Sequence, residues 1–209
     1  ADVQLTFNGT VTDKAGEAGV LRKDGAGTLT LGGANNYTGA TTIANNGGTL
    51  ELAATGGNSA AGSTASVTII GSSSRLLIST SEQVNNSANV TLSGGTIQRG
   101  AGVSETFGDL TLTASSTLNF GGTAEDRFFK FGDLNLGSFT LGVSNFLLGN
   151  KLQYNAADYA AGEALANTFS FTASDARGFS FNSGVFTITA IPEPSTVLAA
   201  LGLAGVLLW

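Results

Sequence analysis

The residues that could perform chemistry in this 209-residue chain are carboxylates, lysines, arginines, tyrosines and hydroxyls, because the sequence contains no Cys, Met or His. Without imidazole and thiol groups there is no Ser-His-Asp or Cys-His nucleophile and no zinc site of the usual ligands. The densest charged group is Glu125-Asp126-Arg127-Phe128, and polysaccharide lyases and hydrolases use carboxylates beside a Lys or Arg. We interpret this group as a solvated loop, and we expect a non-enzyme with no catalytic residue, no cofactor and no metal.

Two other acidic features have structural interpretations. Asp109 and Asp133 occupy equivalent positions of an internal repeat, which predicts a turn or an edge ladder rather than a catalytic pair. The segment Asp24-Gly25-Ala26-Gly27 resembles a calcium loop only weakly, because the iterated Gly-Gly-x-Gly-x-Asp pattern of calcium-binding β-rolls is absent.

The composition favours a folded, exported protein. Only 11% of residues are charged and 42% are hydrophobic, which excludes the composition of disordered chains. The net charge of −6 argues against nucleic acid as a partner, because phosphate binding needs clustered Lys and Arg. A chain that begins at Ala1 is expected to be processed, and its hydroxyl-rich make-up favours removal of a secretion signal.

The elements that would position these residues are short strands that recur with a regular period. Apolar and hydroxyl residues alternate in six segments bounded by Gly and Asn, as in β-strands. The mean step between segments is about 21 residues, a solenoid period. The first apolar residues of the six segments are Leu29, Leu50, Val67, Val90, Leu110 and Leu134.

One repeat is nearly literal. Residues 107–112 (FGDLTL) return 24 residues later as 131–136 (FGDLNL). A second short alternating run follows each copy, at 116–120 and at 138–141. The repetition of both runs predicts a repeated structural turn.

These patterns predict an all-β fold, a parallel and right-handed β-solenoid (β-helix) of six to eight turns over residues 1–155. Stacked turns bury a ladder of Leu, Ile and Val that a single turn cannot bury. Residues 156–191 are predicted to form a cap. An Ala-rich stretch, suited to a short helix or a structured loop, precedes aromatic alternating runs that suit antiparallel strands or final turns.

The last segment, 192–209, differs from the rest of the chain. It contains both prolines, and no charge follows Ser195, a good helix N-cap. A helix from Ser195 would be about 22 Å long, shorter than the roughly 30 Å of bilayer hydrocarbon. Small residues on it would let a second helix approach closely, and we expect this contact face to comprise Ala200, Gly202, Ala204 and Gly205.

The start of this segment resembles the PEP-CTERM sorting signal of exosortase-processed bacterial envelope proteins. The matching residues are Pro192, Glu193, Pro194, Ser195 and Thr196, followed by a Leu/Ala/Gly-rich stretch. The resemblance implies at least transient contact with a membrane. Family members usually end in Arg or Lys, whereas this sequence stops at Trp209.

A second resemblance covers about thirty residues. The segment from Gly25 to Ile43, running on to Leu50, is similar to the autotransporter-associated β-strand repeat of β-helical passenger domains. It implies a β-helix of the bacterial cell surface or extracellular matrix. The C-terminal barrel of true autotransporters is lacking in these 209 residues.

Three functions remain open at this point. The first is a non-enzymatic structural protein that self-associates into a fibre, sheath or layer, a homo-oligomer or polymer with residues 195–209 at a subunit contact. The second is a monomeric anchored adhesin that binds exopolysaccharide through Tyr37 and neighbouring Asn and Thr residues. The third is a polysaccharide lyase.

Overall fold

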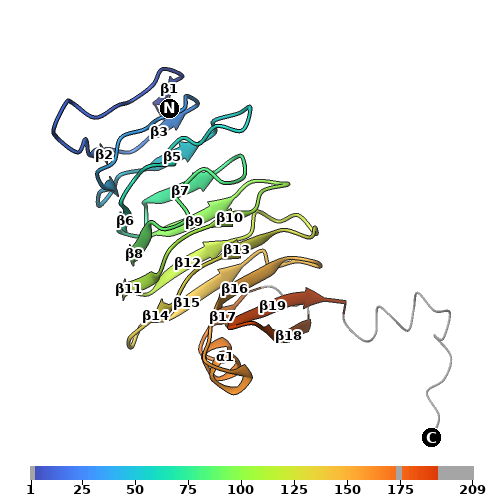
Figure 1. Cartoon of the computed structure of the whole chain (residues 1–209). Helices are drawn as coiled ribbons and strands as arrows, with labels where there is room; N and C mark the ends of the chain where they lie inside the picture. The colour runs from blue at the N-terminus through green and yellow to red at the C-terminus, as the bar shows by residue number, and fades with distance from the viewer. Residues whose placement is uncertain (1–2, 173–175, 193–209) are drawn as a thin grey trace, which may run out of the picture.

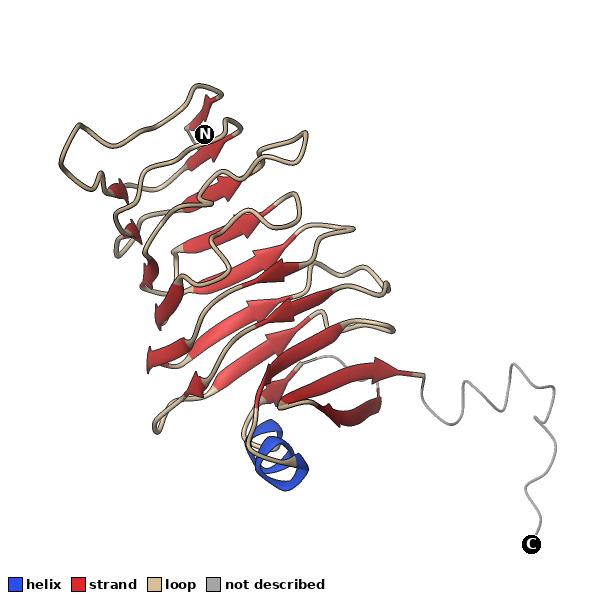
Figure 2. Ribbon diagram, viewed as in Figure 1, coloured by secondary structure: helices blue, strands red, loops and turns tan. Residues whose placement is uncertain are grey.

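A computed structural model describes residues 3–172 and 176–192 of the chain. It is an all-β parallel solenoid of about seven turns, with only 4% of residues in a helix. The strands stack from the N-terminal turn to the opposite end, where the helix lies (Figures 1 and 2). The predicted all-β parallel solenoid is therefore confirmed, while the hand of the coil stays a prediction.

Two parallel sheets run along most of the stack. The eight-stranded sheet contains, in order, β1 (Gln4–Phe7), β3 (Thr28–Leu31), β5 (Thr49–Leu52), β7 (Arg75–Ile78), β9 (Thr96–Arg99), β12 (Ser116–Asn119), β15 (Leu141–Ser144) and β17 (Ser170–Phe171). The six-stranded sheet contains β2 (Leu21–Lys23), β4 (Thr41–Ile43), β6 (Ser66–Ile70), β8 (Asn89–Ser93), β11 (Leu110–Ala114) and β14 (Leu134–Asn135).

A third sheet begins only halfway along the stack. Its order is β10 (Glu105–Thr106), β13 (Phe128–Lys130), β16 (Lys151–Asn155), β19 (Val185–Ile191) and β18 (Ala176–Asn182). The first three strands are parallel, whereas β16, β19 and β18 pair in antiparallel fashion. Early turns therefore have a loop at the corner where later turns have a strand.

The register shows why a period of about 21 residues approximates one turn, although the six segments do not lie in one sheet. Leu29 and Leu50 pair with each other in the eight-stranded sheet, whereas Val67, Val90 and Leu110 follow one another in the six-stranded sheet. The six segments thus belong to two faces of the coil rather than to one. Their mean step still approximates a turn, because both faces advance by one turn per pairing.

Alternation along each strand decides which side chains form the core. In β7, for example, Leu76 and Ile78 are buried, whereas Arg75 and Leu77 are only partly covered. Leu76 lies between Leu50 and Ile97 of the adjacent turns. Inward residues are therefore covered by equivalent apolar residues on both sides, as expected for a solenoid.

The nearly literal repeat stacks each residue on its own copy. The rings of Phe107 and Phe131 lie 5.0 Å apart at an interplanar angle of 9°. Leu110 pairs with Leu134, and the N–H of Gly132 donates to the carbonyl of Gly108 at 3.0 Å. The prediction of a repeated turn is confirmed.

The end that follows β16 is covered by a different kind of structure. Helix α1 (Tyr159–Ala166) begins at Asp158, whose carboxylate accepts from the N–H of Ala161 at 2.8 Å. The helix packs so closely that a Cβ at Gly162 would overlap the ring of Phe186. Strand β17 pairs in parallel with β15, while β18 and β19 form an antiparallel pair. Of the two alternatives for the Ala-rich stretch the structure has the helix, and the aromatic runs form both a parallel strand and an antiparallel pair.

The predicted C-terminal helix is not supported, because residues 193–209 lie outside the described part of the chain. Within the described ranges, no helix is long and apolar enough to cross a membrane.

We predict that Leu76→Ala will lower the free energy of unfolding by about 2–5 kcal/mol, because it opens a cavity in a core position covered from both sides. The matched control is the neighbouring Leu77→Ala, which removes the same atoms from an outward position and should cost less than about 1 kcal/mol. Urea titration followed by circular dichroism measures both. Equal losses for the two variants would contradict the assigned register.

Candidate functional site

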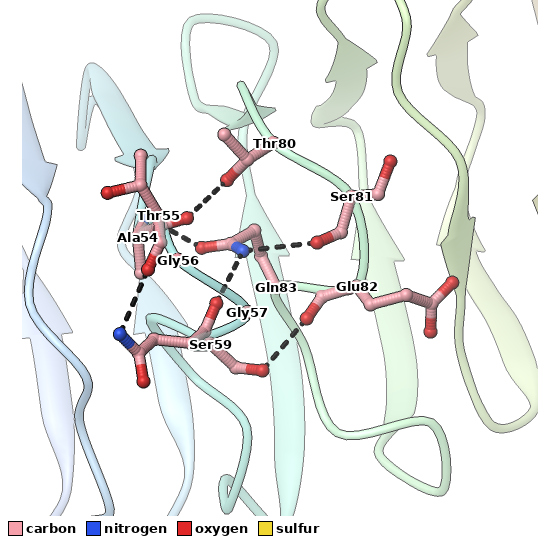
Figure 3. Close-up of a pocket in the computed structure, with 10 residues that line it drawn as sticks. Ala54, Thr55, Gly56, Gly57, Ser59, Thr80, Ser81, Glu82 and Gln83 are labelled. Atoms are coloured by element: carbon pink, nitrogen blue, oxygen red, sulfur yellow. Dashed lines mark hydrogen bonds between the residues drawn. The ribbon is translucent and has the colours of Figure 1, made fainter.

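A polar groove of about 370 Å³ lies where the loops at 54–59 and 80–83 of adjacent turns meet. Figure 3 shows that hydroxyl, amide and carbonyl groups of the two loops point toward one another. Thr80 donates to the carbonyl of Ala54 at 2.8 Å, and Ser59 donates to the carbonyl of Glu82 at 2.9 Å. The polar groups of the groove thus join one turn to the next.

The side-chain amide of Gln83 is the centre of this junction. Its Oε1 accepts from the N–H groups of Ala54 at 2.8 Å and Ala60 at 3.2 Å, while its Nε2 donates to the carbonyls of Asn58 and Ser81. Because an amide offers two donors and two acceptor lone pairs, its bonding capacity is used completely. Gln83 therefore fastens the loops and has no capacity left for a ligand.

Glu105 continues the junction one turn further along. Its buried carboxylate accepts from the backbone N–H groups of Gln83 and Val84, both at 2.8 Å. Burial raises the pKa of Glu105 to about 8, against the two hydrogen bonds that favour its anion. A carboxyl without solvent access cannot reach a substrate, so its role is to join two turns.

These buried polar residues were missed by the sequence analysis, although the pattern contained a signal. Val103, Glu105 and Phe107 alternate at spacing two, and all three are buried. The alternation therefore placed the carboxyl on the inward side. The junction is needed because the turn that precedes Glu105 has no strand at this corner, so its backbone N–H groups need side-chain partners.

The charged group at 125–128 is more than the solvated loop that we expected. The carboxylate of Glu125 accepts from Nη1 of Arg99 at 2.6 Å and from the N–H of Gly102 at 2.8 Å. This arrangement holds the pKa of Glu125 at about 2, with Arg99 the largest cause. Glu125 thereby anchors the loop to the preceding turn.

Arg99 is fully buried and incompletely paired. Its Nε and Nη2 have no hydrogen-bond partner within residues 3–172 and 176–192. Its guanidinium carbon lies 5.4 Å from the centre of the Phe120 ring, a cation–π distance. The Arg99–Glu125 pair is structural, because the guanidinium has no exposed surface for a substrate.

The prediction of an edge ladder at Asp109 and Asp133 is confirmed. Oδ1 of Asp109 accepts from the N–H of Asp133 at 2.8 Å. The ladder extends in both directions, because Oδ1 of Asn89 accepts from the N–H of Asp109 and Asn155 donates to Asp133. Three side-chain hydrogen bonds thus link four successive turns.

The prediction that Tyr37 offers an aromatic face to sugars is wrong. Tyr37 is 1% exposed, and its hydroxyl lies 2.7 Å from Oγ1 of Thr41, which in turn lies 3.0 Å from that of Thr64. Burial raises the pKa of Tyr37. The ring fills the core because it follows the buried Asn35 at spacing two.

A hydroxyl ladder runs along the outer face of the six-stranded sheet. Four threonines occupy equivalent positions in consecutive turns, between Arg22 at one end and Asn135 at the other. All four are partly exposed, and they are Thr42, Thr68, Thr91 and Thr111. The backbone positions of neighbouring threonines are therefore about 4.8 Å apart, the strand spacing.

The weak calcium-loop resemblance at 24–27 is explained by other contacts. The ammonium group of Lys23 donates to the carbonyls of Asp24 at 3.1 Å, Gly25 at 2.6 Å and Gly47 at 2.7 Å. The carboxylate of Asp24 is paired with Arg22 at 2.8 Å. A protein cation therefore occupies the oxygens that a metal would use. In the described residues no group of three or more acidic side chains is placed to hold a metal ion.

The remaining predicted site residues lie outside the described part of the chain, apart from Pro192, which follows β19. Four residues of the sorting motif and the whole contact face belong to this set: Glu193, Pro194, Ser195, Thr196, Ala200, Gly202, Ala204 and Gly205.

We predict that the stability of the protein falls as pH rises from about 4.5 to about 8. Over this range Glu105 ionises in the unfolded chain, whose pKa is near 4.5, but stays protonated in the folded one. The loss is at most about 1.4 kcal/mol per pH unit. Glu105→Gln should abolish this dependence, although its NH2 group then faces one of the two N–H groups, which contact different oxygens of Glu105, and so costs stability below pH 4.5.

Thermal and urea unfolding between pH 4 and 9 measures the effect. The control is Glu82→Gln, which removes a nearby surface carboxylate, keeps Glu105 and should keep the wild-type pH dependence. A Glu105→Gln profile parallel to that of the wild type would show that Glu105 is ionised in the fold.

Comparison with known proteins gives a family match within the first turns. Residues 21–52 match the family model of the passenger-associated-transport-repeat. They comprise strands β2, β3, β4 and β5, and therefore two successive turns. No curated protein and no solved structure matches the chain. The chain thus carries an autotransporter-associated repeat, which confirms that part of the resemblance.

Proposed function

We propose that this chain is a non-enzymatic structural protein of the bacterial cell surface, a β-solenoid subunit that self-associates into a fibre, sheath or layer. The observation that supports this most is that polar side chains, buried and exposed, bond one turn of the coil to the next. Gln83, Glu105 and the ladder through Asp109 all bond one turn to the next. They maintain a shape, and a repeat of exported passenger proteins is part of that shape.

Export and sorting form the second part of the proposal. The repeat at 21–52 favours a secreted or surface-exposed protein. The PEP-CTERM-like residues that begin at Pro192 follow directly on β19, the last described strand. An exosortase signal at this place would hold the solenoid at the membrane until processing, with the folded turns on the outer side.

The two ends of the solenoid restrict how copies can associate. Helix α1 and the antiparallel strands β18 and β19 cover one end. Simple stacking of one copy on the covered end of another would therefore not continue the parallel ladder. Association must use the side faces, residues 193–209 or the N-terminal turn.

The second candidate function is a monomeric anchored adhesin or exopolysaccharide-binding module. The hydroxyl ladder that begins at Thr42 and ends at Thr111 favours it, since it replaces the buried Tyr37 as a glycan surface. A hydroxyl about every 4.8 Å along the axis offers one hydrogen bond per turn to a linear polysaccharide. A lyase finds less support, because Glu105 and the Arg99–Glu125 pair serve the fold.

We predict that the full-length protein forms regular assemblies visible by negative-stain electron microscopy. Deletion of residues 195–209 should abolish or shorten them, because it removes the apolar segment that the subunit contact would bury. The deletion protein should keep the β-sheet circular dichroism spectrum of the full chain.

Two outcomes count against this function. Unaltered assemblies after the deletion would remove the contact role of residues 195–209. A full-length protein that stays monomeric yet binds exopolysaccharides on a glycan array would favour the adhesin instead.

A further inference from the structure

A second polar groove, of about 370 Å³, lies on the eight-stranded sheet. We call it the arginine groove, and its lining comprises residues 72–75 together with Thr49, Thr96, Gln98 and Asn119 of the neighbouring turns. It crosses β5, β7, β9 and β12 in the middle of the stack (Figure 1). Four strands at the usual spacing extend over roughly 14 Å, the length of a short oligosaccharide.

Neutral side chains hold Arg75 in this groove, whereas Arg22 and Arg99 are paired with carboxylates. Its Nε and Nη2 donate to Oγ1 of Thr49 at 3.3 and 3.1 Å, and its Nη1 donates to Oε1 of Gln98 at 3.1 Å. Thr49 belongs to the turn before Arg75, and Gln98 belongs to the turn after it. The guanidinium is therefore oriented from both sides by the protein itself.

The positive charge of Arg75 has no carboxylate partner within residues 3–172 and 176–192. The carboxylate of Glu51, which lies on β5, accepts instead from the hydroxyls of Thr30 at 2.8 Å and Ser79 at 2.5 Å. A guanidinium has five N–H donors, and the contacts with Thr49 and Gln98 use three of them. One N–H of Nη1 and one of Nη2 stay available to a ligand.

Amide groups continue this donor surface over the next two turns. Gln98 and Asn119 pair in register between β9 and β12. Both amide oxygens are engaged, because that of Gln98 accepts from Arg75 and that of Asn119 accepts from Gly121 and Asn145, each at 2.9 Å. In the described part of the chain, both amide NH2 groups lack a protein acceptor. The groove thus presents donors and a positive charge, in a chain of net charge −6.

This combination suits a carboxylate that is surrounded by hydroxyl groups. A carboxylate can accept from two guanidinium N–H groups at once, which gives such pairs their strength and geometry. All eight lining residues are polar and three of them are serines, so the groove lacks the apolar pocket that anchors most protein partners. Nucleic acid needs clustered basic residues, whereas the lining has one.

We propose that the arginine groove binds an acidic polysaccharide, with a uronate carboxylate on Nη1 and Nη2 of Arg75 and sugar oxygens on the amides of Gln98 and Asn119. Glu51 repels the carboxylate from the β5 side and so directs the chain of sugars over β9 and β12. The exposed hydroxyls of Ser72 and Ser73, at the rim of the groove, bond further sugar hydroxyls.

This binding site goes beyond the proposed self-association and does not depend on it. It also differs from the hydroxyl ladder between Thr42 and Thr111, which lies on the six-stranded sheet and carries no charge. A fibre, sheath or layer with such a site in every subunit would bind an acidic matrix polymer as well as its own copies.

The test is isothermal titration calorimetry of the full-length protein with oligogalacturonate and oligoalginate. We expect binding of at least one of them and much weaker binding of its methyl ester, which keeps the sugars and removes the charge. Arg75→Gln should raise the dissociation constant at least about tenfold, because it removes charge-assisted hydrogen bonds. The matched control is Arg22→Gln, which removes the same charge from the six-stranded sheet and should bind like the wild type.

A second variant tests the geometry of the groove at constant net charge. Gln98→Ala keeps Arg75 but removes both the oxygen that orients the guanidinium and the NH2 group that faces the ligand. It should raise the dissociation constant about three- to tenfold, with a circular dichroism spectrum like that of the wild type. Binding that depends on charge alone would not respond to this change.

Three outcomes overturn the inference. The first is a wild-type protein that binds neither oligosaccharide, and the second is equal weakening by Arg75→Gln and Arg22→Gln. The third is an assembly that Arg75→Gln dissociates while neither oligosaccharide binds, which would assign the groove to a carboxylate of a second copy. The deletion of residues 195–209 tests self-association separately, so failure of the glycan site leaves that proposal in place.

Discussion

The structure depends on stacking in register, because each turn is complete only when an equivalent residue covers it from the next turn. The pairing of Phe107 with Phe131 and of Asp109 with Asp133 shows this for apolar and polar side chains alike. Backbone groups obey the same rule, since parallel strands satisfy one another across turns. A residue is therefore suited to its position mainly by what lies 20 to 26 positions away in the chain.

Where a strand is missing, side chains take over the stacking. Gln83 joins loops at the corner before the third sheet begins, and Glu105 joins the first strand of that sheet to the preceding loop. Glu125 fastens a later loop to the turn before it. The same rule applies after β16, where the parallel stacking of the third sheet ends and β19 pairs with β16 in antiparallel fashion.

Much of the fold could be predicted from the sequence, because alternation and period are local signals. The Leu-x-Leu segments and the copy of residues 107–112 followed from spacing, and the helix before β17 followed from an Ala-rich composition. The assignment of strands to faces did not, since Leu50 and Val67 look alike in sequence yet lie in different sheets. Tyr37, Glu105 and Arg99 show the other limit. Residue type suggested exposure, while position placed all three inside, and only the stacked neighbours decide between the two.

The register itself can be tested by cross-linking, because the chain contains no Cys that would interfere. Thr68 and Thr91 pair in adjacent turns on the outer face of the six-stranded sheet, whereas Thr111 lies one turn further from Thr68. Strand spacing places adjacent positions about 5 Å apart, within disulfide range, and positions two turns apart at roughly twice that distance. Thr68→Cys with Thr91→Cys should therefore oxidise to an intramolecular disulfide, and Thr68→Cys with Thr111→Cys should not. Efficient bridging of the second pair, or none of the first, would contradict the stacking in register on which the account rests.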